Sequence, residues 1–255
     1  MKKMPVVFVG HGSPMNAIEN NPYTAEWEAL GQRLSRPKAI LSISAHWFTP
    51  GTRVMDTESP RMIYDMYGFP DELYRIVYAA PGAPDFARRT QELLGENAAI
   101  DNSWGLDHGT WSVLHRVFPK AGIPVFQLSV DQNATPEQHF ALGRALAPLR
   151  EEGVLILGSG SVVHNLTRVD WHNAGGDQWA EAFDRYIYDH VLKRDYDNVV
   201  HFERAGESAW LAFYSIDHFA PLLYVLGASA DSDCIAAFNN SRILGALSMT
   251  SYLFE

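Results

Sequence analysis

Three segments of the chain share one pattern, in which a run of apolar residues ends beside small residues and a histidine. The runs cover residues 6–9, 39–45 and 154–157, and the histidines that follow them are His11, His46 and His164. Continuous apolar runs of this length are typical of strands that are buried on both faces. If the three strands are parallel neighbours, their histidines meet at the carboxyl edge of one sheet, where open α/β folds bind ligands.

Helices are predicted between these runs from prolines and capping residues. Asn21 and Pro22 open a helix that ends before Pro37, and Thr135, Pro136 and Gln138 form a capping box that predicts a helix over 136–151. Further helices are predicted over 83–94, through 113–117, over 177–193 and from about 217, and further strands over 73–79, 123–130 and 243–254. This alternation predicts an α/β fold.

One long irregular segment, residues 49–68, interrupts the alternation. Its end, residues 62–70, carries Tyr64, Tyr67 and the pair Gly68 and Pro70. Such a segment is either a surface loop anchored by aromatic side chains or a lid over a site. We expect a lid, because the chemistry proposed below needs shielding from bulk water.

Composition limits the function classes. The 255 residues are 47% apolar and 20% charged, and no linker or repeat divides them, so a single domain over 1–255 is expected. The net charge of −10 argues against nucleic acid or an anionic membrane as the main partner. The start of the chain shows no apolar signal region, and Cys234 is the only cysteine, so a cytoplasmic protein is expected.

Four histidines are candidate metal ligands, namely His11, His46, His164 and His218. Any one histidine is most often a buried neutral imidazole bound to the backbone. Burying four histidines beside glycines or at the ends of elements costs free energy that an apolar core would avoid. A metal site explains them better, because imidazole is a good ligand for Zn, Fe, Cu or Ni. No local H-E-x-x-H motif is present, so distant segments must assemble the site. The remaining histidines are expected to be solvated or structural, with the exception of His108, which is either a base beside the site or a turn histidine.

The motifs around these histidines resemble a known family. They are Gly10-His11-Gly12-Ser13-Pro14, Ser44-Ala45-His46-Trp47, Gly105-Leu106-Asp107-His108-Gly109, Val163-His164-Asn165-Leu166 and Asp217-His218-Phe219-Ala220-Pro221-Leu222. Their order is typical of the class III extradiol ring-cleaving dioxygenases, and the chain resembles the DOPA 4,5-dioxygenase branch of that class from about residue 5 onward.

The resemblance implies a fold and a metal site. The implied fold is a single three-layer α/β/α domain with a mixed, largely parallel central sheet. The implied site holds one metal on His11 and His46, with His164 and His218 close to it and His108 in the substrate pocket. Where better-known relatives have a carboxylate ligand, this chain has His218 beside Asp217. An all-histidine set suits Zn(II), so Zn(II) and Fe(II) both remain candidate cofactors.

The expected reaction is ring opening of a catechol, with DOPA-like substrates the first choice and O2 the second substrate. His164 is expected to act as acid and base or as a further ligand, and His108 to hydrogen-bond the substrate. The aromatic wall of the pocket is expected from Trp47, Tyr64, Tyr67 and Trp104. The alternatives are a zinc hydrolase on the same histidines and a non-catalytic protein that binds a metal and small aromatics. A monomer or small homo-oligomer is expected.

Overall fold

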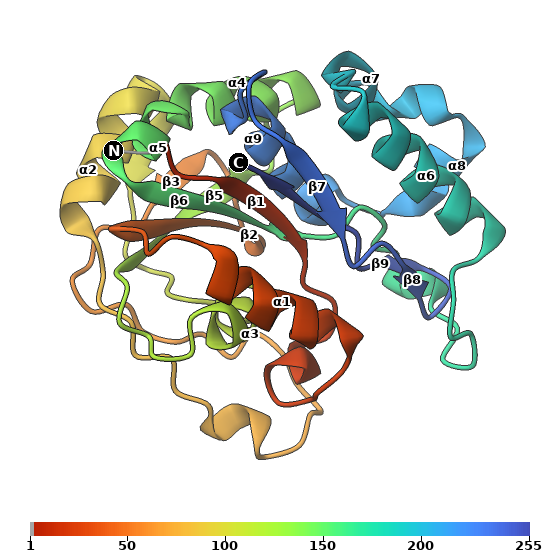
Figure 1. Ribbon diagram of the computed structural model, residues 1–255, viewed down its shortest axis with the longest axis horizontal. Helices are drawn as coiled ribbons and strands as arrows, with labels where there is room; N and C mark the ends of the chain where they lie inside the picture. Colours follow the sequence, from red (N-terminus) through yellow and green to blue (C-terminus); the bar gives the residue numbers. More distant parts are fainter. Residues whose placement is uncertain (1–2) are drawn as a thin grey trace.

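A mixed eight-stranded sheet runs through the protein in the order β4-β3-β5-β2-β6-β1-β10-β7 (Figure 1). The computed structural model describes residues 3–255. The first two residues of the expected domain, where no signal region was expected, lie outside the described residues. The strands of this sheet are β1 (Val6–Gly10), β2 (Ala39–Thr49), β3 (Thr52–Val54), β4 (Ala98–Ile100), β5 (Val125–Asp131), β6 (Val154–Gly160), β7 (Ile235–Phe238) and β10 (Ser251–Phe254).

The centre of the sheet is parallel. β1 and β2 both pair in parallel with β6, which lies between them, and β2 also pairs in parallel with β5. β10 and β7 continue the sheet as antiparallel strands on one side, and β3 lies antiparallel to β5 on the other. The prediction that the three histidine-bearing strands are parallel neighbours is therefore confirmed.

Both faces of the sheet are covered by helices. Along β1, Val6 and Phe8 belong to one apolar cluster while Val7 and Val9 belong to the other, as the alternation of side chains in a strand requires. Figure 1 shows α1 and α3 on one face and α4, α6 and α9 on the other. The helices are α1 (Pro22–Arg33), α2 (Pro84–Leu94), α3 (His108–Val117), α4 (Pro136–Leu146), α5 (Pro148–Glu152), α6 (Gln178–Leu192), α7 (Tyr196–Val200), α8 (Glu207–Ala212) and α9 (Ala220–Ala228). The predicted three-layer α/β/α architecture is confirmed.

The strand predicted over 73–79 is wrong. Leu73–Arg75 forms a single 3-10 turn, and its backbone hydrogen bonds are local, such as Ile76 N–H to the Leu73 carbonyl. The apolar alternation reflects burial of Leu73 and Tyr78 against the cluster beneath α1 and α3, while Val77 faces solvent. Alternating burial without a neighbouring strand therefore produced a false strand signal.

The helix predicted over 136–151 is two helices. α4 ends at Leu146 and α5 begins at Pro148, because proline has no N–H to continue the α4 hydrogen-bond ladder and fits the first turn of a new helix. The predicted start is confirmed, since the Thr135 hydroxyl accepts from the Gln138 N–H and the Gln138 side chain accepts from the Thr135 N–H.

The strand predicted over 243–254 is interrupted. Only β10 joins the main sheet, while β8 (Arg242–Ile243) pairs with β9 (Leu247–Ser248) in a separate two-stranded ladder. The turn between β8 and β9 contains Leu244 and Gly245, both at positive φ, which a continuous strand does not allow.

Within residues 3–255, no helix is both long and apolar enough to cross a membrane.

Candidate metal centre and active site

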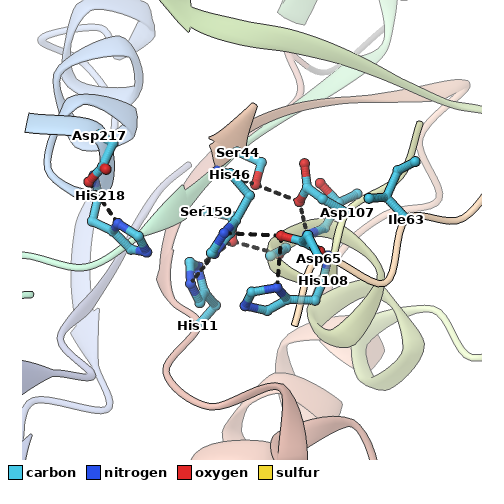
Figure 2. A network of polar contacts seen from close by, with 12 residues as sticks. His11, Ser44, His46, Ile63, Asp65, Asp107, His108, Ser159, Asp217 and His218 are labelled. Carbon is cyan, nitrogen blue, oxygen red and sulfur yellow. Dashed lines mark hydrogen bonds and ion pairs between the residues drawn. The ribbon is translucent and has the colours of Figure 1, made fainter. Parts of the chain in front are cut away.

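Three of the four candidate ligands meet beyond the carboxyl ends of the central strands. His11 follows β1, His46 lies in the last part of β2, and His218 comes from the 3-10 turn Ile216–His218 before α9. One nitrogen of each ring lies within 4.8 Å of the other two. The Nε2 atoms of His11 and His46 are 3.1 Å apart, and Figure 2 shows these rings facing each other with His218 beside them.

The hydrogen bond behind His11 determines which of its nitrogens carries the hydrogen. The Nδ1 atom lies 3.0 Å from the Ser159 hydroxyl, and that hydroxyl donates its only hydrogen to the Gly109 carbonyl at 2.6 Å. Ser159 must therefore accept a hydrogen bond from His11 Nδ1–H. The Nε2 atom of His11 consequently presents a lone pair to the centre.

The other two rings are held in the same way by carboxylates. The Nδ1 atom of His46 lies 3.1 Å from Asp65, and the Nδ1 atom of His218 lies 2.8 Å from Asp217. A carboxylate only accepts, so both Nδ1 atoms carry hydrogen, and in the neutral rings that a metal binds both Nε2 atoms present lone pairs. The His218 Nε2 atom is buried and has no hydrogen-bond partner among the described residues.

This arrangement fits a bound cation. The Nε2 atoms of His11 and His46, 3.1 Å apart, need a positive charge between them, either a bound metal ion or a proton shared by the two rings, and the buried Nε2 atom of His218 adjoins them without a partner among the described residues. Imidazoles whose second nitrogen donates to a carboxylate or hydroxyl are the usual environment of metal-binding histidines. The donor set of His11, His46 and His218 therefore suits a single transition-metal ion.

Burial and the nearby carboxylates together control the protonation of the cluster. Burial, reinforced by the neighbouring imidazoles, lowers the pKa of His11 and of His218 well below the ordinary value, so both rings are neutral at pH 7. Burial also acts to lower the pKa of His46, but the hydrogen bond to Asp65 and the charge of Asp107 outweigh it and raise that pKa. Asp65 is correspondingly held ionised, because the hydrogen bonds from His108 and His46 overcome its burial and lower its pKa.

His218 reaches the centre because β6 ends in glycine. The Ser161 N–H donates to the His218 carbonyl at 2.8 Å, and a Cβ atom on Gly160 would lie only 2.1 Å from the same carbonyl oxygen. Only a residue without a side chain permits this approach of the turn to the strand. The glycine at the end of β6 thus has a steric explanation.

His164 lies beside the cluster rather than within it. Its ring stacks on that of His218 with a centroid separation of 3.5 Å and an interplanar angle of 3°. Its backbone bridges Phe213 and Leu247, which holds it after β6 as a turn residue. Burial lowers the pKa of His164 to about 4. Among the described residues, the three-nitrogen cluster does not include it.

His108 lies on the opposite side of the cluster, at the first position of α3. Its ring centroid is 3.9 Å from that of His46, and its Nδ1 atom is 3.0 Å from Asp65. The fully buried Asp107 accepts hydrogen bonds from Ser44 at 2.6 Å and Gln127 at 2.9 Å. Asp107 also caps α3, so it fixes the start of the helix and thereby the position of His108.

Sequence reasoning missed Asp65 and Ser159, which support two of the histidines. Asp65 lies inside the segment predicted as a lid, and no residue spacing connects it with His46 or His108. Ser159 is part of β6, where it reads as an ordinary strand residue. The N-cap role of Asp107, in contrast, was detectable, because Asp is a preferred N-cap residue and the apolar run of Trp111 and Leu114 follows it.

The four aromatic side chains expected in the pocket wall lie in different environments. Tyr67 is 92% exposed and lines no closed pocket, whereas Trp47 is 3% exposed and packs in the core cluster beneath α1 and α3. Tyr64 packs against the ring of Trp111, and Trp104 donates to Asp107. The segment 62–70 does reach the centre, but through the carboxylate of Asp65 rather than through its tyrosines.

The remaining histidines do not join the cluster. Among them, His139 is buried on α4 with its Nδ1 atom 3.2 Å from the Tyr224 hydroxyl, and His190 lies 2.8 Å from Asp195. His201 lies among acidic side chains near the surface. These placements agree with the expected structural or solvated roles.

The whole chain is similar to known ring-opening dioxygenases. Residues 5–250 match the family described as the catalytic LigB subunit of aromatic ring-opening dioxygenase. The chain belongs to the LigB family. It is 43% identical to 4,5-DOPA dioxygenase extradiol of Escherichia coli K12 over 98% of this chain and 94% of that protein. It is 39% identical to 4,5-DOPA dioxygenase extradiol of Beta vulgaris over 97% of this chain and 95% of that protein.

A solved structure agrees with this assignment to the LigB family. The crystal structure of an uncharacterized protein from Escherichia coli K12 superimposes with a TM-score of 0.85 at 39% identity, covering 99% of this chain and 100% of that chain. The chain is thus a ring-opening dioxygenase, an enzyme that uses an aromatic substrate and O2. LigB enzymes are metal-dependent, and the three-histidine cluster offers the donors that such an ion requires.

Proposed function

We propose that this protein is an extradiol dioxygenase that cleaves the ring of DOPA-like catechols at the 4,5 position. The observation that carries the proposal is the convergence of three Nε2 lone pairs, from His11, His46 and His218, with His108 and His164 on either side. The names of the relatives from Escherichia coli and Beta vulgaris support the choice of substrate. Because the main sheet contains strands from both ends of the chain, we also propose one catalytic domain over 1–255.

The proposed cofactor is one divalent ion on His11, His46 and His218. Three neutral imidazoles accept either Zn(II) or Fe(II), but Zn(II) has no redox chemistry, so Fe(II) is proposed as the active form. When bound, the ion supplies Lewis acidity for the catechol oxygens and electron exchange with O2. The hydroxyl of Ser159 and the carboxylates of Asp65 and Asp217 keep the imidazole lone pairs directed at it.

His108 and His164 would handle the protons. His108 carries its hydrogen on Nδ1 towards Asp65, so its Nε2 atom accepts a hydrogen bond from a catechol hydroxyl. His164 is proposed as the acid and base rather than as a ligand, since it stacks behind His218 and lies outside the three-nitrogen cluster. An imidazole in this place can take a hydroxyl proton and return it when the ring opens.

The proposal is tested by loading the metal-free protein anaerobically with Fe(II) or Zn(II) and adding L-DOPA or other catechols. We expect the Fe(II) form to consume O2 at the rate at which a yellow ring-opened product forms. The Zn(II) form and His11→Ala are expected to consume no O2. Binding of L-DOPA without O2 uptake in the Fe(II) form would contradict the proposal and indicate a binding protein. Ester hydrolysis by the Zn(II) form alone would indicate a hydrolase.

A further inference from the structure

One carboxylate oxygen in the centre is shared by two imidazoles. The Oδ2 atom of Asp65 lies 3.1 Å from His46 Nδ1 and 3.0 Å from His108 Nδ1 (Figure 2). We propose that Asp65 is a positioning residue that sets the tautomer of both histidines at once, the metal ligand His46 and the substrate-side His108. The inference rests on the proposed function and names a residue on which that function depends.

The hydrogen-bond inventory of Asp65 allows only one assignment. Its Oδ1 atom accepts from the His108 backbone N–H at 2.9 Å, so the carboxylate accepts two hydrogen bonds from His108 and also contacts His46 Nδ1. An ionised carboxylate has no hydrogen to donate, and each Nδ1 atom must therefore carry one. When the rings are neutral, both Nε2 atoms are left as acceptors, that of His46 for the metal and that of His108 for a substrate hydroxyl.

The backbone before Asp65 is held in place by pairing with the segment before His108. Ile63 N–H donates to the Leu106 carbonyl at 2.8 Å, and Leu106 N–H donates to the Arg61 carbonyl at 2.8 Å. The Trp111 indole N–H on α3 donates to the Ile63 carbonyl at 3.0 Å. These contacts place Asp65 two residues beyond an anchored point, whereas Tyr67 further along the same segment is exposed.

Loss of the carboxylate would affect the two imidazoles in different ways. Without an acceptor at Nδ1, the hydrogen of a neutral imidazole can move to Nε2. On His46 this hydrogen would occupy the position of the metal. On His108 it would turn an acceptor for the substrate hydroxyl into a donor. One residue of the segment 62–70 thus supports both metal binding and substrate orientation.

The most direct test reads the tautomers themselves by 15N NMR of the histidine side chains. In metal-free and Zn(II)-loaded wild-type protein, we expect His46 and His108 to carry hydrogen on Nδ1. In Asp65→Asn, the amide has one acceptor and one donor group, so we expect at least one of the two rings to move its hydrogen to Nε2. Asp71→Asn is the matched control, because it makes the same change at a 90% exposed carboxylate six residues further along the chain.

Metal affinity and kinetics give a second readout. We expect Asp65→Asn to bind Zn(II) roughly 10- to 100-fold more weakly in a chelator competition, as is usual when the hydrogen-bond partner of a ligating histidine is lost. At saturating Fe(II), kcat is expected to fall while KM for the catechol rises, because His108 also loses its orientation. Asp71→Asn should match the wild type in all three measurements.

Several outcomes would overturn the inference without touching the proposed function. The first is a wild-type spectrum in which neutral His46 or His108 carries its hydrogen on Nε2. The second is an Asp65→Asn variant whose tautomers and Zn(II) affinity both equal those of the wild type. The wild-type spectrum decides the matter even if the variant does not fold. A wild-type protein that binds no metal would instead refute the proposed function.

Discussion

Single residues in this enzyme act mainly by holding imidazoles in one tautomer. His11 donates to a serine, His46 and His108 donate to Asp65, and His218 donates to Asp217. Each contact leaves a lone pair directed at the centre. The chemistry of the centre therefore depends also on residues that do not touch the metal. Three variants, His11→Ala, His164→Ala and Ser159→Ala, separate the roles of ligand, acid/base group and supporting residue.

The first variant pair separates a ligand from an acid/base group. His11→Ala should abolish stoichiometric metal binding, while His164→Ala should keep the metal and lose ring cleavage by roughly 100-fold or more. Metal analysis after gel filtration, combined with O2 uptake, checks both. If His164→Ala loses its metal as completely as His11→Ala does, His164 is a ligand. If His164→Ala keeps near-normal activity, His164 is neither a ligand nor the acid/base group.

The second variant is Ser159→Ala, which leaves His11 Nδ1–H without an acceptor. We expect Zn(II) affinity to fall by about tenfold or more, because the ring is no longer held in the tautomer that presents Nε2. Ser42→Ala is the control, since Ser42 is also a buried strand serine and binds Thr110 at 2.7 Å. Competition with a coloured chelator measures both. Equal Zn(II) affinity of the two variants would show that the Ser159 contact does not support the site.

At the level of elements, α9 is the most deeply buried helix and packs between β6 and α4. All its residues are buried, and a Cβ atom on Gly143 of α4 would lie 2.2 Å from the Tyr224 carbonyl oxygen of α9. Close helix contact of this kind leaves little room for water, so the polar groups inside it must pair with each other. His139 and Tyr224 form such a pair between the two helices.

His139 makes the contact between α4 and α9 sensitive to pH. Burial lowers its pKa to about 4, whereas in the unfolded chain it is near the ordinary value of about 6.5. At a pH between these two pKa values, His139 takes up a proton when the chain unfolds. The free energy of unfolding therefore falls as the pH drops from about 6.5 towards 4. We expect His139→Gln to show a shallower fall than the wild type in urea titrations over this range. Parallel curves would mean that His139 titrates alike in both states.

At the level of the whole molecule, a buried ion pair connects the two ends of the chain. Arg150 on α5 is 1% exposed, donates to the Met4 carbonyl at 2.7 Å and pairs with Asp233 at 2.7 Å. Lys3 also contacts Asp233 at 2.8 Å. This network lies just before β6 begins, at the opposite end of that strand from the histidines, so it stabilises the fold without taking part in the reaction.

Asp233→Asn should destabilise the protein by about 3–5 kcal/mol, because it leaves the buried guanidinium of Arg150 without a countercharge. Below the melting transition, metal content and kcat should stay at the wild-type level.

The contribution of Asp233 to stability should also depend on pH. The hydrogen bonds from Arg150 and Lys3 outweigh burial and lower the pKa of Asp233 to about 2. Its contribution is therefore complete above the ordinary carboxyl pKa and is lost as the pH falls towards 2. Thermal melts at pH 7 and pH 3 check this. A difference between variant and wild type that is equally large at both pH values would contradict it.

The sequence by itself determined the parts of this protein that rest on local patterns. The apolar runs before His11, His46 and His164 predicted parallel strands, since strands covered on both faces need no polar alternation. The capping box at Thr135 predicted the start of α4 because its hydrogen bonds are local. The motifs around the histidines identified the family before any distance was known.

Tertiary structure decided which side chains support the histidines. Asp65 lies nineteen residues from His46 and 43 from His108 along the chain, and only the pairing of Ile63 with Leu106 brings its carboxylate to both rings. Ser159 touches His11 because β1 and β6 are neighbours, although 148 residues separate them. A hydrogen bond acts over about 3 Å in space and leaves no periodic trace in the sequence, so such partners appear only when the chain is folded.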